Sequence, residues 1–263
     1  MPYFALSDIR LYYEIHGEGE PVLLIHGLGS SVRDWELQIP VLSERFQVIA
    51  FDVRGHGRSD KPAGRYSVPQ FAADAAALVQ GLGYEAVHVV GISMGGMIAF
   101  QLAVDFPTCV RSLVVVNSAP ELPVRSVSDR LRFWQREWIV RLLGMRKMGE
   151  VLSRRLFIKP EQEDLRRMFV ERWAQNDPRA YRAATRALVG WSVTDRLSEI
   201  TVPVLFLASD EDYTFIGDKQ AYVAKMKNAR LEIVPDARHA LPVERPDEFN
   251  RRVMAFLQEI GSA

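Results

Sequence analysis

Short runs of Val, Ile and Leu recur along this chain, each bounded by Gly, Pro, Asp or Asn, and they limit its fold more than any other feature. They span residues 22–25, 48–51, 87–90, 113–116 and 204–207. Runs that are apolar on both faces predict strands buried in a parallel sheet. Helix-length segments separate them, as in β-α-β units whose helices cover the sheet. We therefore predict an α/β fold, with a mostly parallel central sheet flanked by helices.

Two parts of the chain depart from this pattern. In residues 9–15 apolar and more polar residues alternate, which predicts an antiparallel strand at the start of the sheet. In residues 121–195 the strand-like runs stop, and Arg-rich sequence with helical spacing takes over. Strand-like sequence resumes at residues 202–208. We predict one discontinuous core, residues 1–120 and 196–263, with residues 121–195 inserted as a helical cap.

Composition narrows the possible partners. The 263 residues are 48% hydrophobic and 25% charged, which is ordinary for a globular protein. Lys plus Arg and Asp plus Glu both number 33, which gives no reason to expect nucleic acid or an anionic membrane as partner. Cys109 is the only cysteine, so no intramolecular disulfide can form. With no signal-like start and no long apolar run, we expect a cytoplasmic location; the oligomeric state stays open.

A nucleophile is indicated where the run at residues 87–90 meets Gly91-Ile-Ser93-Met-Gly95, followed at once by helical sequence. This is the pattern G-x-S-x-G between a strand and a helix. The chemistry favours it because a serine hydroxyl must project from the sheet to reach a base. Side chains at Gly91 and Gly95 would collide with the neighbouring strand and helix, which explains the glycines. Ser93 is therefore the predicted nucleophile.

Five histidines could supply the base, and their local settings separate them. His88 lies within a buried strand pattern, His16 ends the first strand beside a glycine, and His56 sits in a turn. His26 precedes Gly-Leu-Gly after a strand, which suits a loop near developing negative charge. His239 follows the last candidate strand by a short loop, at the edge where open α/β sheets bind ligands. We predict His239 as the general base.

Three carboxylates, Asp210, Glu211 and Asp212, crowd the loop after the strand at residues 204–208. Such acidic loops are usually solvated turns. One of the three can instead orient the histidine from the same edge of the sheet. We favour Asp212 over Asp210, because four residues of loop carry it clear of the strand end toward His239.

The chain resembles the α/β-hydrolase superfamily over nearly its whole length. The resemblance rests on four segments: the H-G loop at residues 26–31, D-x-R-G-x-G-x-S at 52–59, the acid loop at 209–212 and the H-x-x-x-x-E-x-P ending at 239–246. Ser209 stands where the family's acid loop usually has glycine. The chain order serine, acid, histidine is also that of the family. The resemblance implies that the backbone N–H groups of Leu28 and Met94 form an oxyanion hole.

Within the superfamily the motifs look closest to carboxylesterases and 3-oxoadipate enol-lactonases. The implied reaction is hydrolysis of a carboxylic ester or lactone through an acyl-enzyme, with no cofactor. C–C bond hydrolases of vinylogous diketones and cofactor-free haloperoxidases or perhydrolases share much of this sequence and remain alternatives. No metal is expected, because the histidines lack H-E-x-x-H or similar spacing.

The residues of the predicted cap indicate what kind of substrate the protein could bind. It contains Trp134, Trp138, Trp173 and Trp191, which either pack the cap on the core or line a pocket. We name Trp134, Trp138, Trp191 and His26 as candidate contacts to a small-molecule substrate with apolar bulk. Residues 121–195 contain 16 Lys and Arg against 10 Asp and Glu, a formal charge of +6. Either this charge is solvated or paired, or one cap arginine selects a substrate carboxylate.

Overall fold

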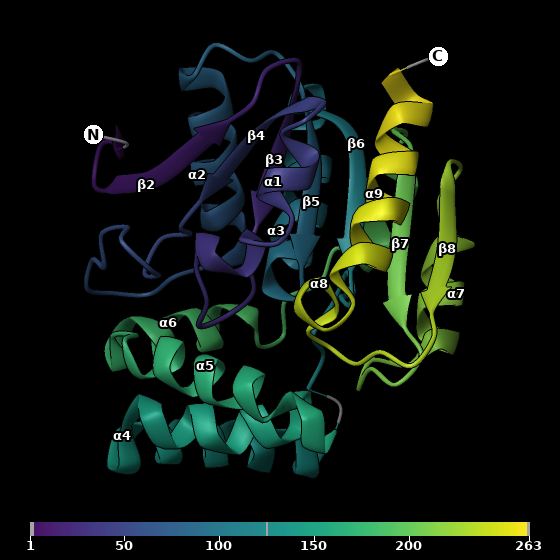
Figure 1. Ribbon diagram of the computed structural model, residues 1–263. Coiled ribbons are helices and arrows are strands. Elements are labelled where there is room, and N and C mark those ends of the chain that lie inside the picture. Colours follow the sequence, from purple (N-terminus) through teal and green to yellow (C-terminus); the bar gives the residue numbers. More distant parts are fainter. Residues whose placement is uncertain (1–2, 125, 262–263) are drawn as a thin grey trace.

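The computed structural model describes residues 3–124 and 126–261. Within them eight strands form one sheet in the order β1-β2-β4-β3-β5-β6-β7-β8 (Figure 1). The strands are β1 (Tyr3–Ala5), β2 (Arg10–His16), β3 (Glu20–Ile25), β4 (Phe46–Phe51), β5 (Val87–Ile92), β6 (Val110–Val116), β7 (Val204–Ser209) and β8 (Ala229–Val234). β2 pairs antiparallel with β1 and β4, and all other neighbours are parallel. The predicted fold class and the antiparallel opening strand are confirmed.

Helices cover both faces of the sheet, as the separating segments predict. They are α1 (Ile39–Leu42), α2 (Val68–Gly81), α3 (Met94–Asp105), α4 (Val127–Leu156), α5 (Glu163–Ala174), α6 (Pro178–Leu188), α7 (Ile216–Val223), α8 (Leu241–Glu244) and α9 (Pro246–Gly261). Among the helices of the described residues, none has the length and apolarity needed to cross a membrane.

The sheet divides the core into two layers because successive strand residues point to opposite faces. In β3, Leu23 and Ile25 pack with α2 and α3, whereas Val22 and Leu24 pack with α9. All four are fully buried. A strand buried on both faces has no polar alternation, which is why the apolar runs marked the strands so well.

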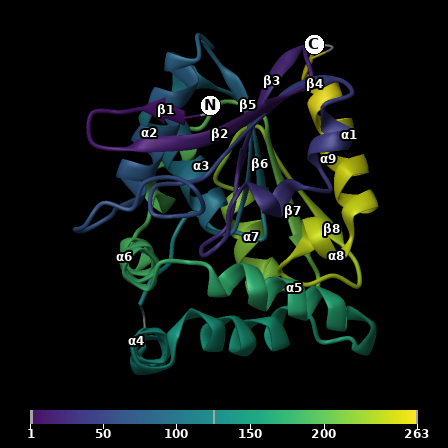
Figure 2. The same cartoon turned by 60° about the vertical axis from the view of Figure 1, so that its left-hand side comes forward.

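The helical insertion, α4 to α6, lies at the end of the sheet toward which β5 and β7 point (Figures 1 and 2). Its two ends meet in a bridge between Glu121 and Ser192. On α6, Ala180 and Ala184 pack into the core, while Tyr181 belongs to a separate apolar cluster with residues of α4 and α5. The insertion is therefore joined to the core through α6, with α4 outermost. α4 is interrupted at Gly144, where φ is 81°.

Candidate active site

Ser93 lies at the turn between β5 and α3 in a strained backbone conformation, with φ 53° and ψ −116°. Such a conformation is costly for a residue with a side chain and is found mainly where function requires it. The turn is tight on both sides. A Cβ at Gly91 would lie 2.3 Å from the Gly95 oxygen, and one at Gly95 would lie 2.0 Å from the Ile25 oxygen. Both positions therefore accept only glycine, for the steric reason expected from the sequence.

His239 and Asp212 meet at the same edge of the sheet. The Nδ1 atom of His239 lies 2.8 Å from the Oδ1 atom of Asp212. The Asp212 side chain is fully buried, and that of His239 is 12% exposed. Burial would raise the pKa of Asp212, but the charge and hydrogen bond of His239, with smaller contributions from Lys219, hold it down at about 2. Asp212 is thus an anion able to orient the imidazole.

The other carboxylate oxygen of Asp212, Oδ2, has two hydrogen-bond partners. Lys219 of α7 places its Nζ atom 3.2 Å from Oδ2, and the Thr214 hydroxyl donates to the same oxygen. The Lys219 side chain is 2% exposed, and burial lowers the pKa of its ammonium group. A buried cation without a paired anion is costly, so Lys219 and Asp212 depend on each other.

The other two carboxylates of the loop point elsewhere. Asp210 accepts the backbone N–H groups of Asp236 and Ala237, at 3.1 and 3.2 Å, and so supports the loop that carries His239. Glu211 pairs with Arg238 near the surface. Of the three candidates for the acid, Asp212 is the one that contacts His239.

Tyr213 occupies the other side of the imidazole. Its hydroxyl lies 2.7 Å from the Nε2 atom of His239, and its ring stacks on the histidine with centroids 4.2 Å apart. The residue is 64% exposed, but surrounding protein groups desolvate its hydroxyl. Desolvation raises the pKa of Tyr213, and a hydrogen bond with the Ser93 side chain is among the influences that lower it. The tyrosine hydroxyl therefore lies between Ser93 and His239.

Asn117, which the sequence analysis did not single out, connects the strands that carry the site. It follows β6 with a positive φ of 42°. Its amide nitrogen donates to the backbone oxygen of His239 at 3.1 Å and to the Ser209 hydroxyl at 2.9 Å, and its oxygen accepts the Ser209 N–H. Ser209, which replaces the usual glycine, thus has a partner. An asparagine directly after a buried strand was the available signal.

The loop after β3 lies beside Ser93. A Cβ at Gly27 would be 3.7 Å from the Ser93 Cβ atom. Leu28 follows in this loop, and Met94 begins α3 directly after Ser93. His26 itself does not reach the surface: it is fully buried, its Nδ1 atom contacts the Gly27 oxygen, and its Nε2 atom accepts the Val53 N–H. Burial lowers the pKa of His26 to about 4. The ring braces the loop and is not available to substrate, contrary to the expectation from the sequence.

The tryptophans of the insertion have different settings. Trp134 and Trp138 are 61% and 48% exposed on α4. Trp191 donates its indole N–H to Gln101 of α3 at 2.6 Å, which ties the insertion to the core. Trp173 of α5 is buried against the loop after β3: a Cβ at Gly29 would lie 2.9 Å from its ring. These positions favour packing roles for Trp173 and Trp191.

Metal ligands require converging His, Cys, Asp or Glu side chains. Within residues 3–124 and 126–261 no group of three such side chains is placed to hold a metal ion.

A mostly parallel sheet with a strained serine between β5 and α3, and a histidine and aspartate pair at the same edge, defines an α/β hydrolase. The chain belongs to the alpha/beta hydrolase fold family, whose sequence profile matches residues 20–246. It is 32% identical to RutD of Azorhizobium caulinodans, a candidate carbamate hydrolase, over 99% of both chains. It is 30% identical to 3-oxoadipate enol-lactonase 2 of Acinetobacter baylyi, covering 97% of this chain and 96% of that protein. The crystal structure of the enol-lactonase from Burkholderia xenovorans superposes with a TM-score of 0.90, at 25% identity, over 98% and 100% of the two chains.

Proposed function

We propose that this protein hydrolyses a carboxylic ester or lactone through an acyl-enzyme, with Ser93 as nucleophile, His239 as general base and Asp212 as the orienting acid. The hydrogen bond of 2.8 Å from His239 to Asp212, at the edge that presents the strained Ser93, is the observation that carries the proposal. A pure binding protein has no need of this strain. Relatives named as an enol-lactonase and a carbamate hydrolase are consistent with acyl transfer.

The proposed reaction has two halves. The Ser93 oxygen attacks the carbonyl carbon while the Nε2 atom of His239 takes the hydroxyl proton. The ester or ring C–O bond then breaks, and the leaving oxygen receives that proton. In the second half, water loses a proton to Nε2 and attacks the acyl carbon, and Ser93 recovers the proton as the acid leaves. Asp212 stays ionised and stabilises the imidazolium that forms in each half.

The negative charge on the carbonyl oxygen needs donors that are already in place. We assign the N–H groups of Leu28 and Met94 to this oxyanion hole. Neither has a hydrogen-bond acceptor among the described residues, and Gly27 and Ser93 lie side by side. The Met94 N–H also opens α3, where the helix dipole favours negative charge. Fixed donors of this kind stabilise the transition state more than the substrate.

Tyr213 has to move during this cycle. When the N–H at Nδ1 donates a hydrogen bond to Asp212, Nε2 has one lone pair, and this lone pair accepts a hydrogen bond from the Tyr213 hydroxyl. The same lone pair must accept the Ser93 proton. In the proposed cycle a substrate that binds at Ser93 displaces the tyrosine hydroxyl and exposes the base.

Residues 121–195 are proposed to act as a cap over Ser93 and His239, separate from a core of residues 1–120 and 196–263. Asn176 of the insertion donates to the Gly29 oxygen at 2.7 Å, next to the proposed oxyanion hole. Together with Leu28 and Met97, the aromatic residues of the cap supply apolar surface, which favours a small substrate with apolar bulk. The cytoplasmic location also stays a prediction.

A substrate panel tests the proposal. It comprises p-nitrophenyl esters, an enol-lactone, a vinylogous dienoic diketone and a peroxide-dependent perhydrolysis assay. We expect kcat/KM to be highest for an ester or the lactone, and Ser93→Ala to lower it by at least about 10³-fold in a protein that stays folded. The highest kcat/KM on the diketone would establish the C–C hydrolase alternative. Full esterase activity of folded Ser93→Ala would refute the assignment of the nucleophile.

A further inference from the structure

The helical insertion contains two groups of arginines. Most have a carboxylate partner: Arg146 with Glu171, Arg166 with Glu163, Arg167 with Asp164, Arg172 with Glu36, Arg179 with Asp177, and both Arg182 and Arg186 with Glu137. For the others, the described part of the chain provides no carboxylate within ion-pair distance: Arg130, Arg132, Arg136, Arg141, Arg154 and Arg155. Of this second group, five are exposed and Arg136 alone is half-buried.

Arg136 lies on the side of α4 that faces α6. Its Nε atom donates to the Tyr181 hydroxyl. Its guanidinium carbon lies 5.3 Å from the centroid of the Tyr181 ring and 6.0 Å from that of Trp173. Both rings rest on the loop after β3, because a Cβ at Gly29 would lie within 3.0 Å of each. The guanidinium is therefore held above the loop that flanks Ser93.

The charge of Arg136 also reaches the hydroxyl beside the proposed base. Desolvation raises the pKa of Tyr213, and the positive charge of Arg136 opposes that rise. Tyr213 in turn contacts His239. Leu28, which directly precedes Gly29, packs against the same apolar cluster as Trp173 and Tyr181, so Arg136 lies on the side of the insertion that covers the loop beside Ser93.

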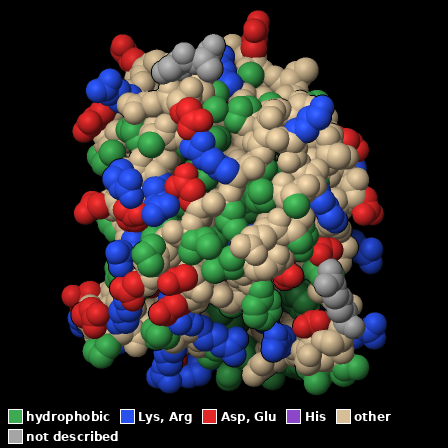
Figure 3. Space-filling model, turned by 90° about the vertical axis from the view of Figure 1, so that its right-hand side faces the viewer, with side chains coloured by type: hydrophobic (Ala, Val, Ile, Leu, Met, Phe, Trp, Pro, Cys, Tyr) green, Lys and Arg blue, Asp and Glu red, His purple; other side chains and the backbone are tan. Residues whose placement is uncertain are grey.

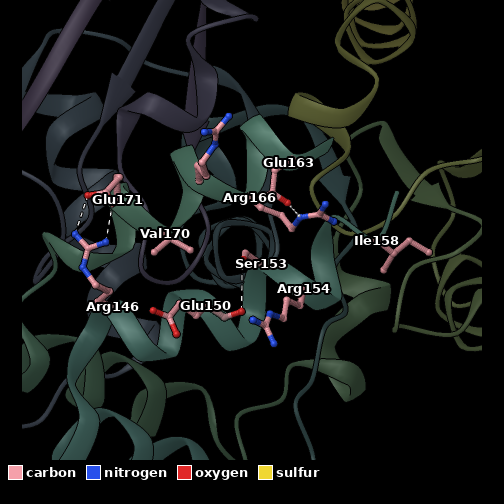
Figure 4. A pocket seen from close by; sticks show the side chains of 10 residues that line it. Arg146, Glu150, Ser153, Arg154, Ile158, Glu163, Arg166, Val170 and Glu171 are labelled. Carbon is pink, nitrogen blue, oxygen red and sulfur yellow. Dashed lines mark hydrogen bonds and ion pairs between the residues drawn. The ribbon is translucent and has the colours of Figure 1, made fainter. Parts of the chain in front are cut away.

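Another set of arginines surrounds a hollow in the insertion. A hollow of about 540 Å³ lies between α4 and α5, and none of its lining residues belongs to the proposed triad. Figure 4 shows Arg146 turned toward Glu171 and Arg166 toward Glu163, so these charges are already matched. Basic side chains also gather at the lower end of the molecule in Figure 3, where the insertion lies. Among the arginines in residues 3–124 and 126–261, Arg136 is the half-buried one without a carboxylate partner.

We propose that Arg136 is the receptor for a substrate carboxylate, so that the preferred substrates are esters or lactones with a free carboxylate on the acyl side. This inference rests on the proposed function. A guanidinium has five N–H donors in a planar fork and stays charged at all working pH values. One donor is used by Tyr181, which leaves an edge free for two parallel bonds to a carboxylate. The flanking rings hold the cation and remove part of its water, which strengthens a bond to an anion.

The test compares two substrates that differ only in charge, p-nitrophenyl hydrogen glutarate and p-nitrophenyl methyl glutarate. The wild-type protein should prefer the anion. Arg136→Met should reduce the ratio of the two kcat/KM values by about 10- to 100-fold, as expected for hydrogen bonds to a charged group. Arg136→Lys should give an intermediate ratio, because it keeps the charge and loses the fork. The exposed Arg132→Met, one turn earlier on α4, is the matched control and should leave the ratio unchanged.

Salt separates recognition from general attraction by the exposed arginines. At about 1 M salt the Debye length is about 3 Å, so attraction by surface charge fades, whereas a partly desolvated pair persists. The inference is overturned if the preference disappears at high salt, if the wild type favours the methyl ester, or if Arg136→Met slows both substrates equally. Failure of the proposed function would give a different result, because hydrolysis of neither ester would then depend on Ser93.

Discussion

Replacing Asp212 by asparagine isolates the role of its charge without changing its shape. The carboxylate lies 2.8 Å from the Nδ1 atom of His239 and is fully buried, so no water can replace it. An amide nitrogen in that position would donate to Nδ1 and fix the proton on Nε2. The histidine could then no longer accept the Ser93 proton. Loss of the correct tautomer costs about 10⁴-fold in kcat, or about 5 kcal/mol of activation free energy.

The matched control is Asp210→Asn, two residues earlier on the same loop. Asp210 accepts two backbone N–H groups in the loop that carries His239. An amide oxygen can keep one of these bonds, and losing the other should lower the free energy of unfolding by about 1–2 kcal/mol. We expect kcat within about threefold of the wild-type value, because the imidazole keeps its partner.

Steady-state hydrolysis of p-nitrophenyl butyrate at pH 7.5 to 8.5 measures the two variants, with thermal unfolding to show that each is folded. Asp212→Asn should fall far below Asp210→Asn in activity. If the two losses are equal or reversed, the orienting acid is not Asp212.

Stability should depend on pH through the same carboxylate. Its folded pKa of about 2 lies below the usual unfolded value of about 3.9. Asp212 therefore stabilises the fold by roughly 2 kcal/mol above pH 4, and this contribution is lost as the pH falls toward 2. Denaturant unfolding between these pH values should show a smaller slope in Asp212→Asn than in the wild type.

Three further outcomes are expected. A serine-directed phosphonate should label Ser93 and leave the buried Cys109 unmodified, as peptide mass spectrometry can show; labelling elsewhere would move the site. Tyr213→Phe frees the Nε2 atom of His239 and should speed phosphonate labelling by about 2- to 10-fold, the value of one hydrogen bond, whereas a tenfold loss would assign the hydroxyl to proton transfer. Lys219→Met leaves an unbalanced anion beside His239 and should move the acid limb of the kcat/KM profile to higher pH; an unmoved limb in a folded variant would show that Lys219 only packs.

Much of the fold could be predicted because its strands are buried on both faces. The first strands show the limit of that reasoning. The alternation in β2 predicts that Leu11 and Ile15 share a buried face, but Ile15 is 39% exposed, whereas Tyr12 is buried. The guanidinium of Arg58 lies 3.8 Å from the Tyr12 ring and covers it. A contact made across 46 residues of sequence has no local signal.

The same limit applies to the site. Gly91 and Gly95 identified the turn around Ser93, because the steric need for glycine is local. The choice between Asp210 and Asp212 was harder, since both follow the same strand and both are carboxylates. Asp210 contacts backbone N–H groups of the loop that carries His239, whereas Asp212 contacts the His239 ring. Those directions follow from the turn after β7, which the sequence does not encode in any residue-by-residue pattern.

The positive charge of residues 121–195 shows that a count of charged residues alone does not identify a ligand. A charge of +6 in the sequence could indicate an anionic ligand, a solvated surface or pairing with the acidic core. The structure shows the last two arrangements, and the first is the one that we propose for Arg136. Arg172 pairs with Glu36 of the core, while exposed arginines such as Arg132 are solvated and screened by salt. Ligand selection depends instead on a cation that is partly desolvated, has a free donor edge and lies near the reacting groups. Arg136 is the cation that we propose for this role, because it is half-buried and lies above the loop that flanks Ser93.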